Sequence, residues 1–384
     1  MRRMQVKISM FAALALAAAV AVATAGTTAP ERAAGREAKL QRALDQVVSA
    51  GAPGAVLLVR DGDHTIRLTS GYGNLKPRTP MRAADRFRVG SITKAFVATV
   101  VLQLVAERKL RLVDSVERWL PGVVPNGKRI TVRQLLNHTS GLFDAGGDTG
   151  FVTAAFRDPL RDWAPRRIVA IATAHKPYFA PGTGWAYSNT NYFVLGLIVE
   201  AATGHSLASE LRHRIFAPLR LRGTSLPAAP RIAGGHAHGY FLHPLEDVTV
   251  GSPSIVWASG ALVSNVADLA RFFRALLGGR LLRADLLRAM ETMVPASLAL
   301  TGEFAYGLGL VKVPGPCGAL WGHTGGSPGY VADALNSKNG RRQVVVLVNA
   351  TDSLSADVGH FRSFALPERA GRAVDRLIHT AYCG

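Results

Sequence analysis

Apolar and polar positions repeat with two different periods in the first third of the chain. Residues 36–51 repeat their apolar positions with the period of a helix, which predicts an amphipathic helix. Residues 54–73 form two β-rich runs around Asp61 and Gly62, which predicts a β-hairpin. Residues 91–110 are apolar over most of a helical surface, so we expect a long buried helix there.

The rest of the chain shows the same two periods in the reverse order. Helical patterns with long loops continue to about residue 290, at 132–138, 165–174, 192–203 and 266–279. The period then returns to two, which predicts strands at 306–313, 318–326, 330–337 and 341–350 before a final helix at 366–383. The last two strands are joined by a turn with Asn339 and Gly340 at its centre.

Strands therefore lie at both ends of the chain, and helices lie between them. This order predicts an α/β (α+β) fold in which one antiparallel sheet is flanked by helices and a mostly helical lobe is inserted. We expect a single domain over residues 26–384, with an α/β lobe at about 34–90 and 300–384 and a helical lobe at about 91–299. A cleft between the two lobes is the expected place for an active site.

The first 25 residues follow neither pattern. Arg2, Arg3 and Lys7 precede an apolar run of small residues, and residues 23–25 read Ala-Thr-Ala, which predicts a signal peptide cleaved before Gly26. The alternative is a single membrane anchor, for which the run is only marginally long. We expect a secreted, extracytoplasmic protein without an integral membrane anchor after cleavage, and the cell wall is a candidate location.

Charge and cysteine content refine this picture. The formal net charge is +19, which would attract the protein to anionic wall polymers, membrane surfaces or nucleic acid. The basic residues are scattered, with no basic-and-aromatic stripe, so nucleic acid is not an expected partner. Cys317 and Cys383 are the two cysteines, and an even number in an exported chain favours a disulfide over two free thiols.

The most informative motif is Ser91-x-x-Lys94 at the start of the predicted helix. A serine hydroxyl needs an adjacent base to become a nucleophile, and a lysine is a base only when burial lowers its pKa. Residues three apart share one helical face, and the apolar helix could provide the burial. The alternative is that Ser91 only caps the helix, with a lysine in the first turn.

Two further motifs could supply the other groups that a serine nucleophile needs. Tyr187-Ser188-Asn189 could supply a tyrosine that is held as a phenolate or that shuttles a proton; alone, it reads as a loop aromatic and a helix cap. His323-Thr324-Gly325 lies on a predicted strand whose small residues would let a substrate backbone pair with its edge. There His323 could provide positive charge, although a structural histidine before a glycine-rich bend is an equal alternative.

Two competing sites are less well supported. Ser327 lies in a G-x-S-x-G pattern, but Pro328 lacks the N–H that a nucleophile elbow uses, and a strand pair rather than a helix follows. Three histidines occur close together without a carboxylate pattern, so we expect a solvated loop and neither a metal nor another cofactor; they are His236, His238 and His243.

The order S-x-x-K, Y-S-N, H-T-G resembles that of the serine β-lactamase and penicillin-binding-protein superfamily. Within it, the chain looks most like exported D-alanyl-D-alanine carboxypeptidases and the class-C β-lactamase-related group. The resemblance covers the chain from about residue 40 to its end and implies a β-lactamase/transpeptidase-like fold. The stretches that carry it are "FRVGSITKAF", "LLNHTSGL", "WAYSNTNY", "ASGALVSNVADLARFF", "YGLGL" and "GHTGGSPGY".

The resemblance also implies a mechanism and a set of site residues. Ser91 would form an acyl-enzyme, Lys94 and Tyr187 would transfer protons, and Asn189 would bind the substrate amide and orient the lysine. Backbone N–H groups of Ser91 and Gly326 would bind the oxyanion. His323 takes the place of the usual lysine. The remaining implied roles are a substrate contact at Thr324 and Gly325, a cleft wall at Trp257 and a disulfide between Cys317 and Cys383.

Departures from the family pattern bear on the substrate. The carboxypeptidases carry an arginine after "YGLGL" for the terminal carboxylate, where this chain has Val311 and Lys312, and Gly326 replaces a residue that often carries a hydroxyl. The leading hypothesis is a monomeric serine D-Ala-D-Ala carboxypeptidase that acts on peptidoglycan-type peptides and is covalently acylated by β-lactams. The alternatives are an esterase or β-lactamase on the same scaffold, and a non-catalytic wall-binding protein.

Overall fold

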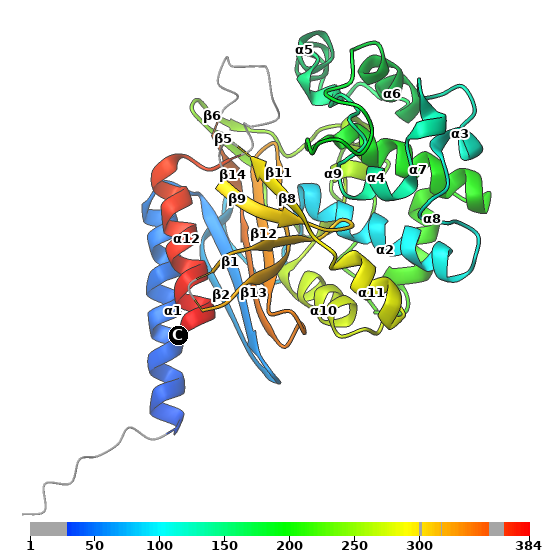
Figure 1. The fold of residues 1–384 in the computed structure, drawn as a ribbon. Coiled ribbons are helices and arrows are strands. Elements are labelled where there is room, and N and C mark those ends of the chain that lie inside the picture. The colour runs from blue at the N-terminus through cyan, green and yellow to red at the C-terminus, as the bar shows by residue number, and fades with distance from the viewer. Residues whose placement is uncertain (1–28, 299–301, 316, 353–364) are drawn as a thin grey trace, which may run out of the picture.

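The structure is a computed structural model that describes residues 29–298, 302–315, 317–352 and 365–384. The predicted signal peptide lies outside these residues. Figure 1 shows three layers: a helix pair, a central sheet and a body of helices. No helix among the described residues combines the length and apolarity needed to cross a membrane.

The central layer is a nine-stranded antiparallel sheet built from both ends of the chain, as predicted. Its order is β3-β2-β1-β13-β12-β11-β10-β9-β8. The strands are β1 (Gly54–Asp61), β2 (His64–Leu75), β3 (Arg78–Pro80), β8 (Val294–Leu298), β9 (Gly302–Tyr306), β10 (Val311–Val313), β11 (Leu320–Ser327), β12 (Tyr330–Asn336) and β13 (Arg342–Val348).

Two expectations about this sheet need correction. Of the strand expected at 306–313, only β10 and the last residue of β9 are strand, because Gly307 to Leu310 close a tight turn in which the Gly307 N–H donates to the Leu310 carbonyl at 2.7 Å. Strand β8 was not predicted, and it starts before the expected end of the helical lobe at about residue 299. Both differences arise at the edge of the sheet, where the strands are too short to give a clear alternation of apolar and polar residues.

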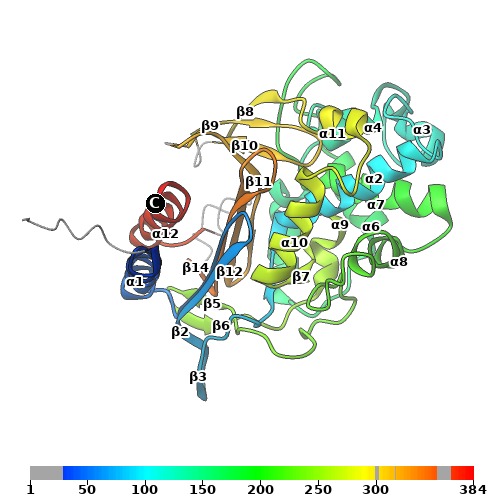
Figure 2. The ribbon, with the colours of Figure 1, turned by 90° about the horizontal axis from the view of Figure 1, so that it is seen from below.

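One face of the sheet is covered by the helices from the two ends of the chain, α1 (Ala29–Ser49) and α12 (Glu368–Cys383), which lie side by side in Figures 1 and 2. Successive side chains of a strand point to opposite faces. Leu57 of β1 accordingly packs in a cluster with Leu44 and Leu377 of these helices. Its neighbours Val56 and Leu58 belong to the larger core on the other face.

The second face is covered by the helical body. Its helices are α2 (Thr93–Ala106), α3 (Val116–Trp119), α4 (Val132–Leu136), α5 (Thr149–Arg157), α6 (Pro165–Thr173), α7 (Asn189–Thr203), α8 (Leu207–Leu211), α9 (Trp257–Gly260), α10 (Val266–Leu277) and α11 (Ala284–Met290). Short 3-10 turns are η1 (Gly90–Ile92), η2 (Gly127–Arg129), η3 (Ala145–Gly147) and η5 (Pro253–Ile255), and η4 (Arg212–Phe216) is a π-helical turn. The buried helix expected at 91–110 is α2 with η1 in front of it.

Two small sheets lie outside the nine-stranded sheet. Strand β4 (Phe87–Arg88), which leads to Ser91, pairs with β7 (Val263–Ser264), and β5 (Tyr240–Leu242) lies between β6 (Leu245–Asp247) and β14 (Ala350–Thr351). The predicted disulfide is present: Cys317, which precedes β11, is bonded to Cys383 at the end of α12. A closed loop of this length is expected to stabilise the fold by about 4 kcal/mol by restricting the unfolded chain.

Candidate active site

The residue Ser91 lies in the 3-10 turn η1, between the sheet and the helical body. It is not the cap of helix α2, as one reading of the sequence suggested: the cap position is Ile92, and no side chain caps either turn. The Ser91 side chain is only partly buried and receives a hydrogen bond from the Lys94 Nζ at 2.9 Å. The functional reading of this serine therefore has the geometric support that the capping reading lacks.

Two glycines hold this turn against strand β11. A β-carbon on Gly325 would lie 2.0 Å from the carbonyl oxygen of Val89 and 3.0 Å from the backbone nitrogen of Ser91. Likewise, a β-carbon on Gly90 would lie 2.3 Å from the carbonyl oxygen of Gly326, and Gly90 has a φ of +49°. Only glycine permits so close an approach of two backbones. The position of Ser91 is thus fixed by main-chain contact with β11.

The Lys94 ammonium is fully buried and has three hydrogen-bond acceptors. Besides Ser91 Oγ, its Nζ donates to Asn189 Oδ1 and to the Ser259 carbonyl, each at 2.8 Å. Burial lowers the pKa of Lys94 to about 7, and the negative charge of Asp144 partly opposes this shift. Near neutral pH the lysine is therefore balanced between its charged form and a neutral amine.

The arrangement also directs the neutral amine. A neutral lysine keeps two N–H donors and gains a lone pair. If the two donors stay on the amide of Asn189 and the carbonyl of Ser259, the lone pair points at Ser91 Oγ. Lys94 can then accept the proton of the Ser91 hydroxyl, which is the function of a general base.

Asp144 is a buried carboxylate that the sequence interpretation missed. Its oxygens accept hydrogen bonds from the backbone N–H of Asn189 at 3.0 Å, from Asn189 Nδ2 at 3.1 Å and from the Gly146 N–H at 3.3 Å. Burial raises the pKa of Asp144, while these hydrogen bonds and Lys94 act against that rise. Because it fixes the amide of Asn189, Asp144 turns Asn189 Oδ1 toward the lysine.

Tyr187 lies beside the serine and the lysine, as predicted. The Lys94 Nζ is 4.8 Å from the centre of its ring, and the Ser91 side chain is close enough to favour a lower pKa of the phenol. Burial nevertheless raises the pKa of Tyr187 well above that of a free tyrosine. The expectation of a resting phenolate is therefore wrong, and the residue is placed to pass a proton as a neutral phenol.

A second unpredicted residue, His138, supports the ring of Tyr187. The two rings stack with their centres 4.4 Å apart. His138 is buried, and its Nδ1 accepts hydrogen bonds from the Ser188 N–H at 3.2 Å and from Asn191 Nδ2 at 3.1 Å. Burial and the charge of Lys94 hold the pKa of His138 well below its usual value, so this histidine is a neutral packing partner.

His323 is also neutral, which corrects the expectation that it contributes positive charge. Its Nε2 lies 3.0 Å from the Tyr306 hydroxyl, and its Nδ1 donates to the carbonyl of Thr324. Burial first, and then the charge of Lys94, lower the pKa of His323 to about 3. The histidine is therefore a structural part of the site at neutral pH.

Strand β11 offers a free edge beside Ser91. It pairs with β12 from Trp321 to Ser327, whereas β10 accompanies it only as far as Gly322. Within the described ranges, the part from His323 to Ser327 has no strand on its second side. An extended substrate can add to such an edge through its backbone. Thr324 is exposed on this segment, and its substrate contact stays a prediction, as does the oxyanion role of the Ser91 and Gly326 N–H groups.

The other sequence candidates make no hydrogen bond with Ser91, Lys94 or Tyr187 in the described part of the chain. Ser327 is buried at the end of β11 and enters a hairpin with β12, so the elbow interpretation is excluded. Trp257 has a φ of +23° and packs on Gly196 of α7, and its role as a cleft wall stays a prediction. Lys312 is exposed with its Nζ 5.4 Å from the ring centre of Trp321.

The three loop histidines have local partners. His236 Nδ1 is 2.7 Å from the Gly234 carbonyl, His238 Nδ1 is 2.7 Å from Asp247, and His243 Nδ1 is 2.8 Å from Asp352. Among the described residues, no group of three or more metal-binding side chains is present.

Known proteins are similar to this chain over most of its length. A family model described as Beta-lactamase matches residues 31–364. The crystal structure of a D-stereospecific amidohydrolase from Streptomyces sp. has 37% sequence identity and a TM-score of 0.79, over 91% of this chain and 99% of that one.

Two curated proteins extend the comparison. Penicillin-binding protein 4* of Bacillus subtilis (strain 168) is 26% identical over 366 residues, which are 86% of this chain and 78% of that protein. A D-aminopeptidase of Brucella anthropi is 26% identical over 301 residues, which are 78% of this chain but only 56% of the enzyme. The chain thus spans little more than half the length of that aminopeptidase.

Proposed function

The chain belongs to the β-lactamase family of serine hydrolases, and from this premise we propose that Ser91 cleaves amides of D-amino acids through an acyl-enzyme. The observation that carries the proposal is the position of Lys94 Nζ, 2.9 Å from Ser91 Oγ and held by two further acceptors. A buried amine with a pKa of about 7 is suited to remove the serine proton at neutral pH.

The proposed reaction has two halves. Lys94 takes the proton of Ser91 while Oγ bonds to the substrate carbonyl carbon, and the carbonyl oxygen becomes an oxyanion facing the N–H groups of Ser91 and Gly326. The C–N bond then breaks as the leaving nitrogen receives that proton from Lys94, directly or through the neutral hydroxyl of Tyr187. Water repeats the sequence on the ester, with Lys94 again as base, and releases the acid and free Ser91.

The charge of the site bears on the substrate class. A carboxypeptidase must bind the terminal carboxylate of its substrate, usually with a cation. His323 is neutral and Gly326 has no hydroxyl, so neither residue provides a positive charge or a side-chain donor of this kind for a carboxylate. The similarity to a D-stereospecific amidohydrolase and to a D-aminopeptidase supports D-amino-acid amides and peptides as the first class of substrates to test.

The D-Ala-D-Ala carboxypeptidase activity is the second candidate, and two observations favour keeping it. Penicillin-binding protein 4* is similar over 86% of this chain, and Lys312 is an exposed cation on the strand that borders β11. Esters and β-lactams remain further acyl donors to test. We also propose export across one membrane, supported by the signal-like residues 1–25 and by the disulfide between Cys317 and Cys383.

The test combines covalent labelling with a substrate panel. Mass spectrometry after incubation with penicillin should show one adduct on wild type and on Ser327→Ala, and none on Ser91→Ala. Equal labelling of Ser91→Ala and wild type would refute the assignment of the nucleophile. D-phenylalanine amide, its L-enantiomer, an acylated D-Ala-D-Ala peptide and p-nitrophenyl acetate should then be compared. Faster release of D-alanine from the peptide than of ammonia from the amide would reverse the order of the two candidates.

A further inference from the structure

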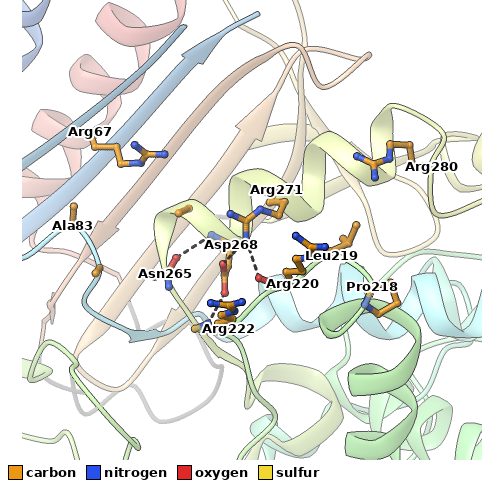
Figure 3. A pocket seen from close by; sticks show the side chains of 13 residues that line it. Arg67, Ala83, Pro218, Leu219, Arg220, Arg222, Asn265, Asp268, Arg271 and Arg280 are labelled. Atoms are coloured by element: carbon orange, nitrogen blue, oxygen red, sulfur yellow. Dashed lines mark hydrogen bonds and ion pairs between the residues drawn. The ribbon is translucent and has the colours of Figure 1, made fainter. Parts of the chain in front are cut away.

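A cavity of about 830 Å³ lies outside the active site, between strand β2, helix α10 and the loop that follows η4. Its lining is rich in arginine: Figure 3 shows Arg222 near the start of α10, Arg67 on the neighbouring strand and Arg280 at the far end of the helix. We call it the arginine cavity; the arginines that line it are Arg67, Arg220, Arg222, Arg271 and Arg280.

The positive charge of the arginine cavity is neutralised only in part by the protein itself. Asp268 is the one acidic residue in its lining, and it is buried. Asp268 already accepts hydrogen bonds from the Gly223 N–H at 2.7 Å and from Thr224 Oγ1 at 3.0 Å, and it pairs with Arg271 at 3.2 Å. In the described part of the chain, no carboxylate pairs with the other four arginines.

The surroundings add to the positive potential. Helix α10 begins here, with the side chain of its cap residue Asn265 accepting from the Asp268 N–H at 2.9 Å. The start of a helix carries partial positive charge. Nearby Arg60 has a lowered pKa, first because it is partly buried and then because Arg274, Arg67 and Arg271 repel its charge. Asp63, which pairs with Arg274 at 3.1 Å, offsets only part of this repulsion.

The chemistry of the arginine cavity defines its ligand. A guanidinium group presents a planar fork of N–H donors that fits two oxygens of a phosphate group, and it remains charged at physiological pH. All five arginines are exposed, so a ligand can reach them from solvent. Several unpaired guanidinium groups around a volume of this size suit a ligand with more than one phosphate group rather than a single small anion.

We propose that the arginine cavity is a binding site for a ligand that carries several phosphate groups. The site is formed by β2, residues 83–84, the loop at 218–223, α10 and Arg280 beyond its end, and none of the lining residues belongs to the catalytic cluster. This inference does not depend on the proposed amide hydrolysis. Two sources share the required chemistry, a free oligophosphate and a phosphodiester polymer.

The test measures binding of tripolyphosphate to the full chain by calorimetry at low salt. The double variant Arg222→Gln/Arg280→Gln should bind roughly tenfold or more weakly, because hydrogen bonds between charged groups are among the stronger ones in proteins. The matched control Arg166→Gln/Arg167→Gln removes the same charge from exposed positions on α6 and should stay within twofold of wild type.

Thermal unfolding gives a second readout that needs no variant. Tripolyphosphate should raise the midpoint of wild type in a saturable way that sodium chloride of equal ionic strength does not reproduce. Displacement by a poly(glycerol phosphate) oligomer assigns a phosphodiester polymer, and failure to displace assigns a free oligophosphate; both outcomes support the site. Absence of saturable binding up to about 10 mM, or equal weakening in the two double variants, would overturn the proposal.

Discussion

The active site and the arginine cavity differ in how far their positively charged side chains are buried. Lys94 is fully buried, and burial brings its pKa down to about 7. The arginines of the cavity are exposed and, apart from Arg271, have no acidic partner among the described residues. Burial makes a cation into a base that can give and take a proton, whereas exposure keeps a cation available for an anion. The total of 45 lysines and arginines cannot distinguish these two uses.

The largest expected effect is the loss of the buried base. Replacing Lys94 by methionine keeps the volume and removes the amine, so kcat/KM for p-nitrophenyl acetate should fall about 10³-fold or more. The control Lys128→Met removes an exposed lysine and should leave kcat/KM within twofold. If Lys94→Met retained a tenth of the activity with its circular dichroism unchanged, the lysine would not be the base.

The next effect tests whether the backbone contact positions Ser91. The β-carbon of Gly325→Ala would collide with the Val89 carbonyl, so acylation by penicillin should slow at least about tenfold and the free energy of unfolding should fall by about 1–3 kcal/mol. The control Gly371→Ala, in helix α12 with open space around it, should stabilise the protein slightly. An unchanged rate of acylation in Gly325→Ala would show that the turn can move without loss of reactivity at Ser91.

A smaller effect concerns pH. Because the base must be neutral, kcat/KM should fall as the pH drops through about 7, which is the pKa of Lys94. The charge of Asp144 raises that pKa, so Asp144→Asn should move the inflection to lower pH while reducing the plateau by about 10–100-fold through the loss of alignment. The control is Asp162→Asn, at an exposed position. An upward shift of the inflection would contradict the electrostatic assignment.

The smallest effect separates the two regions. The rate of hydrolysis of an uncharged ester should change less than about twofold in Arg222→Gln/Arg280→Gln. It should also change less than about twofold between low salt and 0.5 M sodium chloride at about 25 °C, because salt screens buried interactions poorly. Binding of tripolyphosphate should weaken strongly under the same salt change. Parallel salt sensitivity of hydrolysis and binding would mean that the catalytic cluster is less shielded than its burial indicates.

Periodicity predicted most of the fold, because strands buried on one face and amphipathic helices leave a local signal. It missed β8 and the break between β9 and β10, where the strands are short. In the site, the motifs identified Ser91 with Lys94 and Tyr187 with Asn189, since each pair lies within one short stretch of sequence.

The charge states and the supporting residues could not be predicted in this way. Asp144 and His138 come from loops that are brought to the site only by tertiary packing, and the neutrality of His323 follows from burial. The arginine cavity could not be predicted from the sequence for the same reason. Its residues come from segments about 150 and 40 positions apart in the sequence, so a scan for local clusters reads them as scattered.

The contact between Gly90 and Gly326, together with that between Gly325 and Val89, has a consequence for the evolvability of the scaffold. The turn that carries the nucleophile is held against β11 by main-chain atoms, so side chains that do not contact Ser91 can be exchanged without disturbing the position of the turn. A laboratory library that preserves these three glycines and randomises Thr324, Lys312 and Trp257 should therefore yield new acyl-group preferences while most members still react with penicillin.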